Sequence, residues 1–183
     1  MGAEEVRHRL VCFLWICLLL SASGCGGRGP QRPSHRSGTR PKADSAALAL
    51  MEMNQRMAIA ADEEVLQYVQ GREDAARFAQ MPFSNAWVRV LEKGDEQGAC
   101  PQKDETWRLH IKTYSLRGQL LLDTEQEYRI GRNELPMCIE MHINEWHRGA
   151  EVVIAAPWYS AHGMMGTGDV PAYENVLLEI SIL

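Results

Sequence analysis

Three residues near the C-terminus, Ser160, His162 and Asp169, are of the types that form a nucleophilic triad. In such a triad a histidine accepts the proton of a serine hydroxyl while a carboxylate orients the ring. Here all three lie in one short segment, and no Gly-x-Ser-x-Gly motif surrounds the serine. The alternative is that they are ordinary loop residues, and the sequence argues against acyl transfer.

Cys138 and His142 lie four residues apart, a spacing that places two metal ligands on one face of a helix. No second pair follows, because His147 is five residues beyond His142 and points elsewhere. Similarly, the glycines between Gly163 and Gly168 have the density of a phosphate-binding loop. Val170-Pro171 requires extended backbone where the helix of such a loop would begin. The sequence therefore predicts neither a metal nor a nucleotide, and no other cofactor.

The N-terminus has the pattern of an export signal. Arg7 and Arg9 precede an apolar run, 10–20, that is too short to span a bilayer. Small residues then lead to Cys25, as in the lipobox of bacterial lipoproteins, whose leader is cleaved and whose new N-terminal cysteine is lipidated. An ordinary cleaved signal peptide is the alternative. We expect a signal peptide at 1–24, lipidation at Cys25, and an anchor in the bacterial cell envelope.

The remaining cysteines are Cys100 and Cys138, because Cys12 and Cys17 belong to the leader. An oxidising compartment would permit a disulfide between them, but spacing alone cannot show whether they are close enough. Two separate thiols remain the alternative.

Charge is distributed unevenly along the chain. Residues 26–43 contain five basic residues and no acid, whereas from Asp44 onward 12 Lys and Arg face 22 Asp and Glu. Nucleic-acid binding needs a basic face on the folded part, so the acidic body argues against it. We interpret 25–43 as a lipidated, flexible basic tether.

Apolar residues recur at steps of three and four between about Ser45 and Gln70, which predicts an amphipathic helix that ends at Gly71. A short helical segment is expected at 73–79. We assign 44–81 to an N-terminal helical segment and 82–183 to a second domain. Whether the long helix pairs with a second copy stays open.

The second domain reads as strands around one helix. Strands are expected from Trp87, over 106–116, 119–123, 127–130 and 151–156, and finally over 173–183. A single core helix is expected over 134–146, and a long loop over 157–172. The fold class is therefore α+β, with a mostly antiparallel sheet wrapped against one helix.

Several short motifs in this order resemble the FKBP-type peptidyl-prolyl cis-trans isomerases. They are Leu116-Arg117-Gly118, Asp123, Tyr128-Arg129-Ile130-Gly131, Arg148-Gly149-Ala150-Glu151, Val152-Val153-Ile154, Pro157, Ala161-His162-Gly163 and Val170-Pro171, with the terminal strand 177–183. The family usually reads Ala-Tyr-Gly and Ile-Pro at the last two motifs. Together with the leader and helix, the pattern is similar to that of the gliding-motility-associated lipoproteins.

The resemblance implies a half-wrapped sheet with a proline-binding pocket. It implies catalytic roles for Asp123, Tyr128 and His162, and substrate contacts from Ile111, Leu122, Leu135, Pro136, Ile139, Val170 and Leu178. Five of these places, those of Ile111, Leu122, Ile139, His162 and Leu178, usually hold an aromatic ring. Pro136 also lacks a main-chain N–H where the family's bound peptide finds a donor.

Each of these positions also has a plainer reading. The aliphatic residues could be ordinary core, Asp123 a turn acid, and His162 either a hydrogen-bond donor or a loop residue.

By the same resemblance, the chain is a lipid-anchored isomerase that assists the folding of exported envelope proteins. Its expected partners are proline-containing polypeptides and the membrane, on the periplasmic side of the outer membrane, with no nucleic acid. The alternatives are a non-catalytic FKBP-like peptide-binding or chaperone module and a structural subunit of an envelope complex.

Overall fold

The structure, a computed structural model, describes residues 45–183, which belong to a unit that runs from Asp44 to Leu183. The signal peptide, Cys25 and the basic tether predicted from the sequence lie outside the described residues. Within them, no helix is long and apolar enough to cross a membrane.

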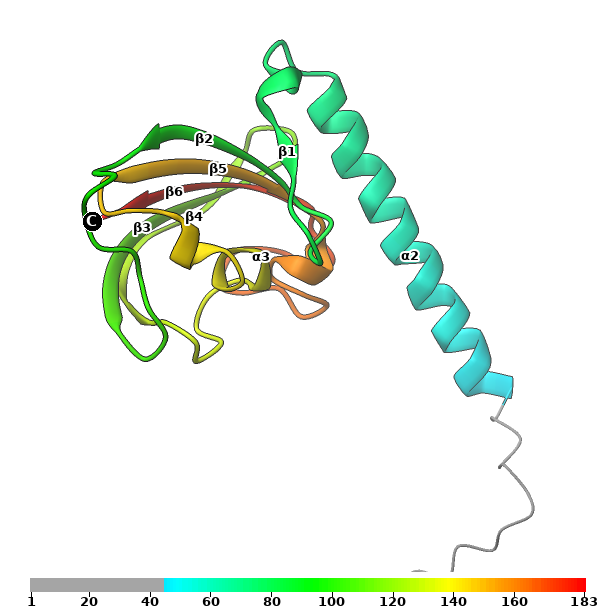
Figure 1. The fold of residues 1–183 in the computed structure, drawn as a ribbon. Helices are drawn as coiled ribbons and strands as arrows, with labels where there is room; N and C mark the ends of the chain where they lie inside the picture. The colour runs from blue at the N-terminus through cyan, green and yellow to red at the C-terminus, as the bar shows by residue number, and fades with distance from the viewer. Residues whose placement is uncertain (1–44) are drawn as a thin grey trace, which may run out of the picture. The chain divides into compact units, whose positions relative to one another are not determined.

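Six antiparallel strands form one sheet in the order β1-β2-β5-β6-β3-β4. The strands are β1 (Ala79–Gln80), β2 (Trp87–Lys93), β3 (Thr106–Ser115), β4 (Leu120–Arg129), β5 (Ala150–Ala156) and β6 (Val176–Ile182). The helical elements are α2 (Ser45–Gln70), α3 (Met137–Glu140) and three 3₁₀ turns, η1 (Ala75–Arg77), η2 (Ile143–Glu145) and η3 (Trp158–Ser160). Figure 1 shows the sheet arching over α3. The predicted α+β class, a half-wrapped sheet with a preceding amphipathic helix, is confirmed.

Alternation along the strands separates two faces of the sheet. The inner face, toward α3, carries the main core, in which Leu109, Ile154 and Leu178 are fully buried. On the outer face, Val153 and Ala155 form a second apolar cluster with α2. Because each buried aliphatic side chain contributes about 1.5–3 kcal/mol, both clusters stabilise the same sheet from opposite sides.

Helix α2 forms where the sequence predicted it, from Ser45 to Gln70. It contains no Gly or Pro and is rich in Ala, Met, Leu and Glu, which favour helix. Only its C-terminal half is buried, through Ala61, Val65 and Val69, whose spacing of four residues makes one stripe. The helix ends where the Gly71 amide bonds to the Gln67 carbonyl.

The predicted single helix over 134–146 is wrong. Pro136 is extended and serves as the N-cap, so α3 begins only at Met137. The i−4 hydrogen bonds then persist for two residues before the His142 amide bonds to the Ile139 carbonyl instead. The segment therefore breaks into α3 and the turn η2.

The two strands predicted at 119–123 and 127–130 are one continuous strand, β4, paired with β3 from Leu120 to Arg129. The intervening residues Thr124, Glu125 and Gln126 are polar on both faces, which concealed the strand in the sequence. The reason for this polarity is structural: one side of β4 borders a cavity and the other faces solvent.

Candidate functional site

A cavity of about 410 Å³ opens on the inner face of the sheet. Strands β3 and β4, the segment before α3 and the loops after η3 surround it. Its apolar lining consists of Ile111, Leu122, Leu135, Pro136 and Ala161, and its polar lining of Thr113, Thr124, Gln126, Tyr128, Asn133, Glu134, His162 and Thr167, with Gly168. The arrangement is a half-apolar hollow that a small ring could enter.

Six of the residues implied by the resemblance meet at this cavity: Ile111, Leu122, Tyr128, Leu135, Pro136 and His162. Three others, Ile139, Val170 and Leu178, do not line it. They are at most 3% exposed and belong to the main core cluster. These three residues belong to the same core cluster as the lining residues Ile111 and Leu135, so they contribute to packing and not to the cavity surface.

Asp123 lies on the outer face and does not reach the cavity. It sits opposite Lys112 in the β3–β4 register, and its Oδ1 is 2.6 Å from Nε2 of His110. Successive side chains of a strand point to opposite faces, so a strand that aims Leu122 into the cavity must aim Asp123 away from it. The structure does not bring Asp123 together with the other predicted catalytic residues.

His162 enters the cavity from the loop after η3. Its Nε2 lies 3.5 Å from Oγ1 of Thr113, which is fully buried on β3. Burial lowers the pKa of His162 below its ordinary value. The ring is therefore neutral near pH 7 and offers one N–H donor and one acceptor.

Tyr128 is nearly buried at the β4 side of the cavity. Its hydroxyl lies 3.3 Å from Oγ1 of Thr124, which donates to the Ile111 carbonyl at 3.4 Å. With the threonine proton used in this way, the tyrosine hydroxyl donates to Thr124. Its remaining lone pairs can then accept a hydrogen bond from a ligand.

The threonines and Gln126 were missed by the sequence analysis, although a signal was present. Thr113 follows Ile111 by two residues, and Thr124 and Gln126 continue the alternation from Leu122 to Tyr128. A period of two from the recognised positions would have found all three. They make the cavity more polar than the resemblance implied.

The loop that carries Ala161 and His162 is fixed to α2. Tyr159 donates its hydroxyl to Asp62, and the Asn85 amide donates to the same carboxylate at 3.1 Å. Burial, followed by the bond to Asp62, raises the pKa of Tyr159 to about 12, so the hydroxyl remains a donor. We call this group of Asp62, Tyr159 and Asn85 the first clamp. It joins α2, the turn η3 and the connection between β1 and β2.

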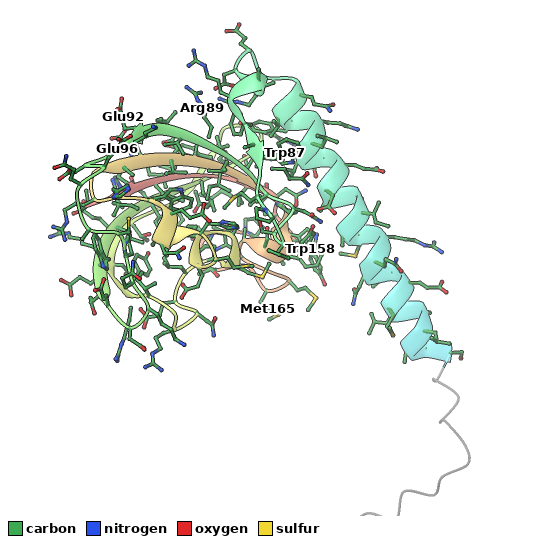
Figure 2. The ribbon with its side chains drawn as sticks, in the orientation of Figure 1. Trp87, Arg89, Glu92, Glu96, Trp158 and Met165 are labelled. Carbon is green, nitrogen blue, oxygen red and sulfur yellow. The ribbon has the colours of Figure 1, made fainter. Side chains whose placement is uncertain are left out.

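A second clamp lies beside the first. Asn175 accepts from the Trp158 amide at 2.9 Å and donates to Glu64 at 2.6 Å. Figure 2 shows Trp158 at the end of the domain nearest α2, whereas Glu92 and Glu96 lie at the opposite end. Both clamps hold the turn η3, and η3 leads directly into the loop that carries His162.

The other residues with chemical potential have structural partners instead. Ser160 is fully buried and donates to the Pro157 carbonyl at 3.1 Å, and His142 contacts Glu145 and the Pro82 carbonyl. Among the described residues, no group of three or more His, Cys, Asp or Glu could hold a metal ion.

Cys100 and Cys138 are both free thiols. Cys138 is fully buried, which raises its pKa to about 12, whereas Cys100 lies 3.2 Å from Nδ1 of His147.

No protein-family model and no curated protein matches the chain in sequence. Solved structures do match it. The peptidyl-prolyl cis-trans isomerase PPIase from Pseudomonas syringae pv. tomato aligns with a TM-score of 0.56 and 16% identity, over 69% of this chain and 93% of that one. FkpA from Escherichia coli aligns with a TM-score of 0.56 and 14% identity, over 100% of this chain and 72% of that one. At these identities the likeness is one of fold, and the fold of this chain is FKBP-like.

Proposed function

We propose that the chain is a lipid-anchored peptidyl-prolyl cis-trans isomerase that assists the folding of exported envelope proteins. The observation that carries this proposal is the cavity of about 410 Å³ on the inner face, where Ile111, Leu122, Tyr128, Leu135, Pro136 and His162 converge. The FKBP-like fold supports it, because the cavity lies where the resemblance places a proline pocket.

The chemistry would require no covalent step. Rotation about an X-Pro bond must cross a barrier of about 18–20 kcal/mol. The twisted amide loses resonance and part of its dipole, so a water-poor apolar environment favours it over the planar form. In this chain Leu122, Leu135 and Ile111 would enclose the proline ring.

The polar lining would hold the peptide around that ring. His162 is neutral and can donate one N–H, and Tyr128 can accept one hydrogen bond from the peptide. Pro136 has no N–H to offer, so a donor must come from side chains instead. We assign the donor role to His162.

The test is cis/trans exchange of an X-Pro peptide, measured by NMR with substoichiometric protein. We expect exchange faster than the uncatalysed time of about 10–100 s, and a loss of this acceleration in Leu122→Arg, which would fill the hollow. His162→Tyr, which restores the residue of the family pattern, should retain or increase the rate. Absence of acceleration with a panel of X-Pro peptides would exclude catalysis.

The second candidate function is a peptide-binding or chaperone module that holds unfolded chains without isomerising them. The observation that favours it is the lining itself, which contains threonine, glutamine and aliphatic side chains, with a phenol ring from Tyr128 and an imidazole from His162. Binding of a proline peptide, together with suppression of aggregation and without accelerated exchange, would identify this function.

The membrane anchor is proposed from the leader alone. Cys25 follows the small-residue site and would carry the lipid, which would place the domain on the periplasmic side of the outer membrane. Cys25→Ser should abolish acylation and release the protein from the membrane fraction. An unacylated variant that remains fully in that fraction would contradict the anchor.

The N-terminal half of α2 supports a further proposal, a homodimer. Leu48, Leu50, Met51 and Met53 are each about half exposed or more. Pairing two such helices would bury these side chains. Sedimentation should show a dimer that Met51→Glu dissociates. A monomeric wild-type protein would instead leave this surface for another subunit of an envelope complex, the structural alternative.

A further inference from the structure

Strand β4 is the last strand of the sheet, and no strand of residues 45–183 pairs with its outer edge. We infer that this edge docks the polypeptide: an extended segment adds to β4 as a further strand, with a proline in the cavity and Lys or Arg immediately beside it. The inference rests on the proposed function, since it requires that the cavity hold the proline.

The side chains of β4 alternate in a way that suits such a segment. Leu122, Thr124, Gln126 and Tyr128 all line the cavity, so the cavity runs along the inner side of this edge. A strand added to β4 would lie about 4.8 Å away and would turn every second side chain toward the same side. One of those side chains would enter the cavity.

The backbone of β4 is oriented to receive this segment. The Arg129 amide donates to Oε2 of Glu134 at 2.8 Å, so it points away from β3. Amide and carbonyl directions alternate along a strand, and the register from Leu122 to Arg129 is unbroken. The backbone amides and carbonyls that point away from β3 are therefore those of Asp123, Glu125 and Glu127. These groups would pair with a bound chain.

Proline fits this geometry in only one way. It has no N–H to donate, so it is tolerated in an added strand only where its nitrogen faces away from the partner. At such a position the proline carbonyl also points away from β4, and the two residues beside it make the hydrogen bonds. Those neighbouring residues turn their side chains to the outer face.

The outer face of β4 carries three exposed acids, Asp123, Glu125 and Glu127. Their charge should decide which peptide residues are favoured next to the bound proline. Asp123 contacts His110 and Glu125 contacts Arg108 at 2.7 Å, whereas Glu127 has no ion-pair partner among the described residues. Side chains opposite one another in paired strands have Cβ atoms about 4.5–5.5 Å apart. A Lys or Arg next to the proline therefore meets an acid, and an Asp or Glu is repelled.

The test uses the full-length protein and two peptides that differ only in the residues flanking one proline, Lys-Pro-Lys and Glu-Pro-Glu. Exposed pairs contribute about 0.2–1 kcal/mol each, so we expect the lysine peptide to bind about five- to ten-fold more tightly at low salt. Glu127→Lys should reduce or reverse this preference. Glu92→Lys, the same change on exposed β2, is the matched control and should leave the preference intact.

Backbone pairing is tested separately with a peptide that is N-methylated on a residue next to the proline. The amide of this residue is the one that would donate a hydrogen bond to β4. We expect this methyl group to weaken binding at least ten-fold, while an N-methyl two residues outside the paired segment has little effect. Proline-dependent binding that ignores both the flanking charge and the methyl group would overturn the edge inference and leave the pocket standing. Failure of all proline peptides to bind would overturn both.

Equal binding of the Lys-Pro-Lys and Glu-Pro-Glu peptides would contradict the charge selection. It would mean that the acids only protect a free edge from pairing.

Discussion

The two faces of the sheet differ in how their polar groups are used. On the outer face, the carboxylates of Asp62 and Glu64 are committed to the clamps that hold α2 to the loop, and ion pairs cover the strands. On the inner face, His162 has one long contact to Thr113 and otherwise opens into the cavity. The carboxylates of Asp62 and Glu64 are therefore engaged in contacts within the fold, whereas His162 makes one long contact at the cavity.

The largest expected effect separates core from cavity wall. Leu178 is fully buried on the inner face, while its neighbour Leu177 is half-buried on the outer face. Leu178→Ala should lower the free energy of unfolding by about 2–5 kcal/mol, because the site cannot fully collapse around the missing atoms.

Leu177→Ala, as the matched control, should cost clearly less. Urea unfolding measures both variants. Equal costs would indicate that the two faces are packed alike.

The next effect concerns the first clamp. Asp62→Ala removes the acceptor of the Tyr159 hydroxyl and one of the two acceptors of the exposed Asn85 amide, which also donates to the Tyr159 hydroxyl oxygen at 3.1 Å, so we expect a cost of about 0.5–1.5 kcal/mol. Because the freed loop carries His162, peptide affinity should fall as well.

A double-mutant cycle with Tyr159→Phe isolates the pair. Because each single variant already removes the hydrogen bond between the two side chains, the double variant should cost less stability than the sum of the two single variants. If affinity were unchanged while stability fell, the clamp would support only the fold. Absorbance should also show Tyr159 ionising only at about pH 12.

A smaller effect is expected from pH. Burial lowers the pKa of His162 in the folded state, so the unfolded state binds more protons between that pKa and the ordinary value of about 6.5. Stability should therefore be fully present above pH 6.5 and should fall as pH decreases through this window.

His162→Gln should remove this contribution to the pH dependence, as measured by urea unfolding from pH 5 to 7. Glu134 is the acid that lines the same cavity. An unchanged pH profile in the variant would show that His162 does not titrate with a lowered pKa.

The smallest effect is chemical. Cys138 is fully buried with a pKa of about 12, and Cys100 is partly exposed. At neutral pH an alkylating reagent should modify Cys100 and leave Cys138 intact until the protein unfolds, as mass spectrometry can show. Rapid modification of Cys138 would mean that the inner core opens readily.

Periodicity in the sequence was sufficient for α2, β3, β5 and β6, because each buries one face against a packed neighbour. It failed at β4 and at the segment that leads into α3, where polar residues or a proline line the cavity. Thr124 and Gln126 keep the period of two but are polar, so the apolar pattern is lost there, and Pro136 delays the start of the helix. We expect such departures from the packing pattern where a cavity has to receive a ligand as well as support the fold.

The candidate site could be predicted in part. The resemblance located six of the cavity residues, but it could not decide which side of a strand each residue takes. Asp123 shows this clearly, since a shift of one residue moves a side chain to the opposite face. The pairing of Tyr159 with Asp62 was also beyond prediction, because the two residues are far apart in sequence and only the docking of α2 brings them together.

The most direct measurement is a titration of the methyl-labelled protein with a proline peptide, followed by NMR. We predict chemical-shift changes at Ile111, Leu122 and Leu135, which line the cavity on the inner face, and none at Val153 and Leu177 on the outer face. Shifts confined to the outer face, or no shifts at any of these methyl groups at saturating peptide, would contradict the proposal that the cavity receives the proline.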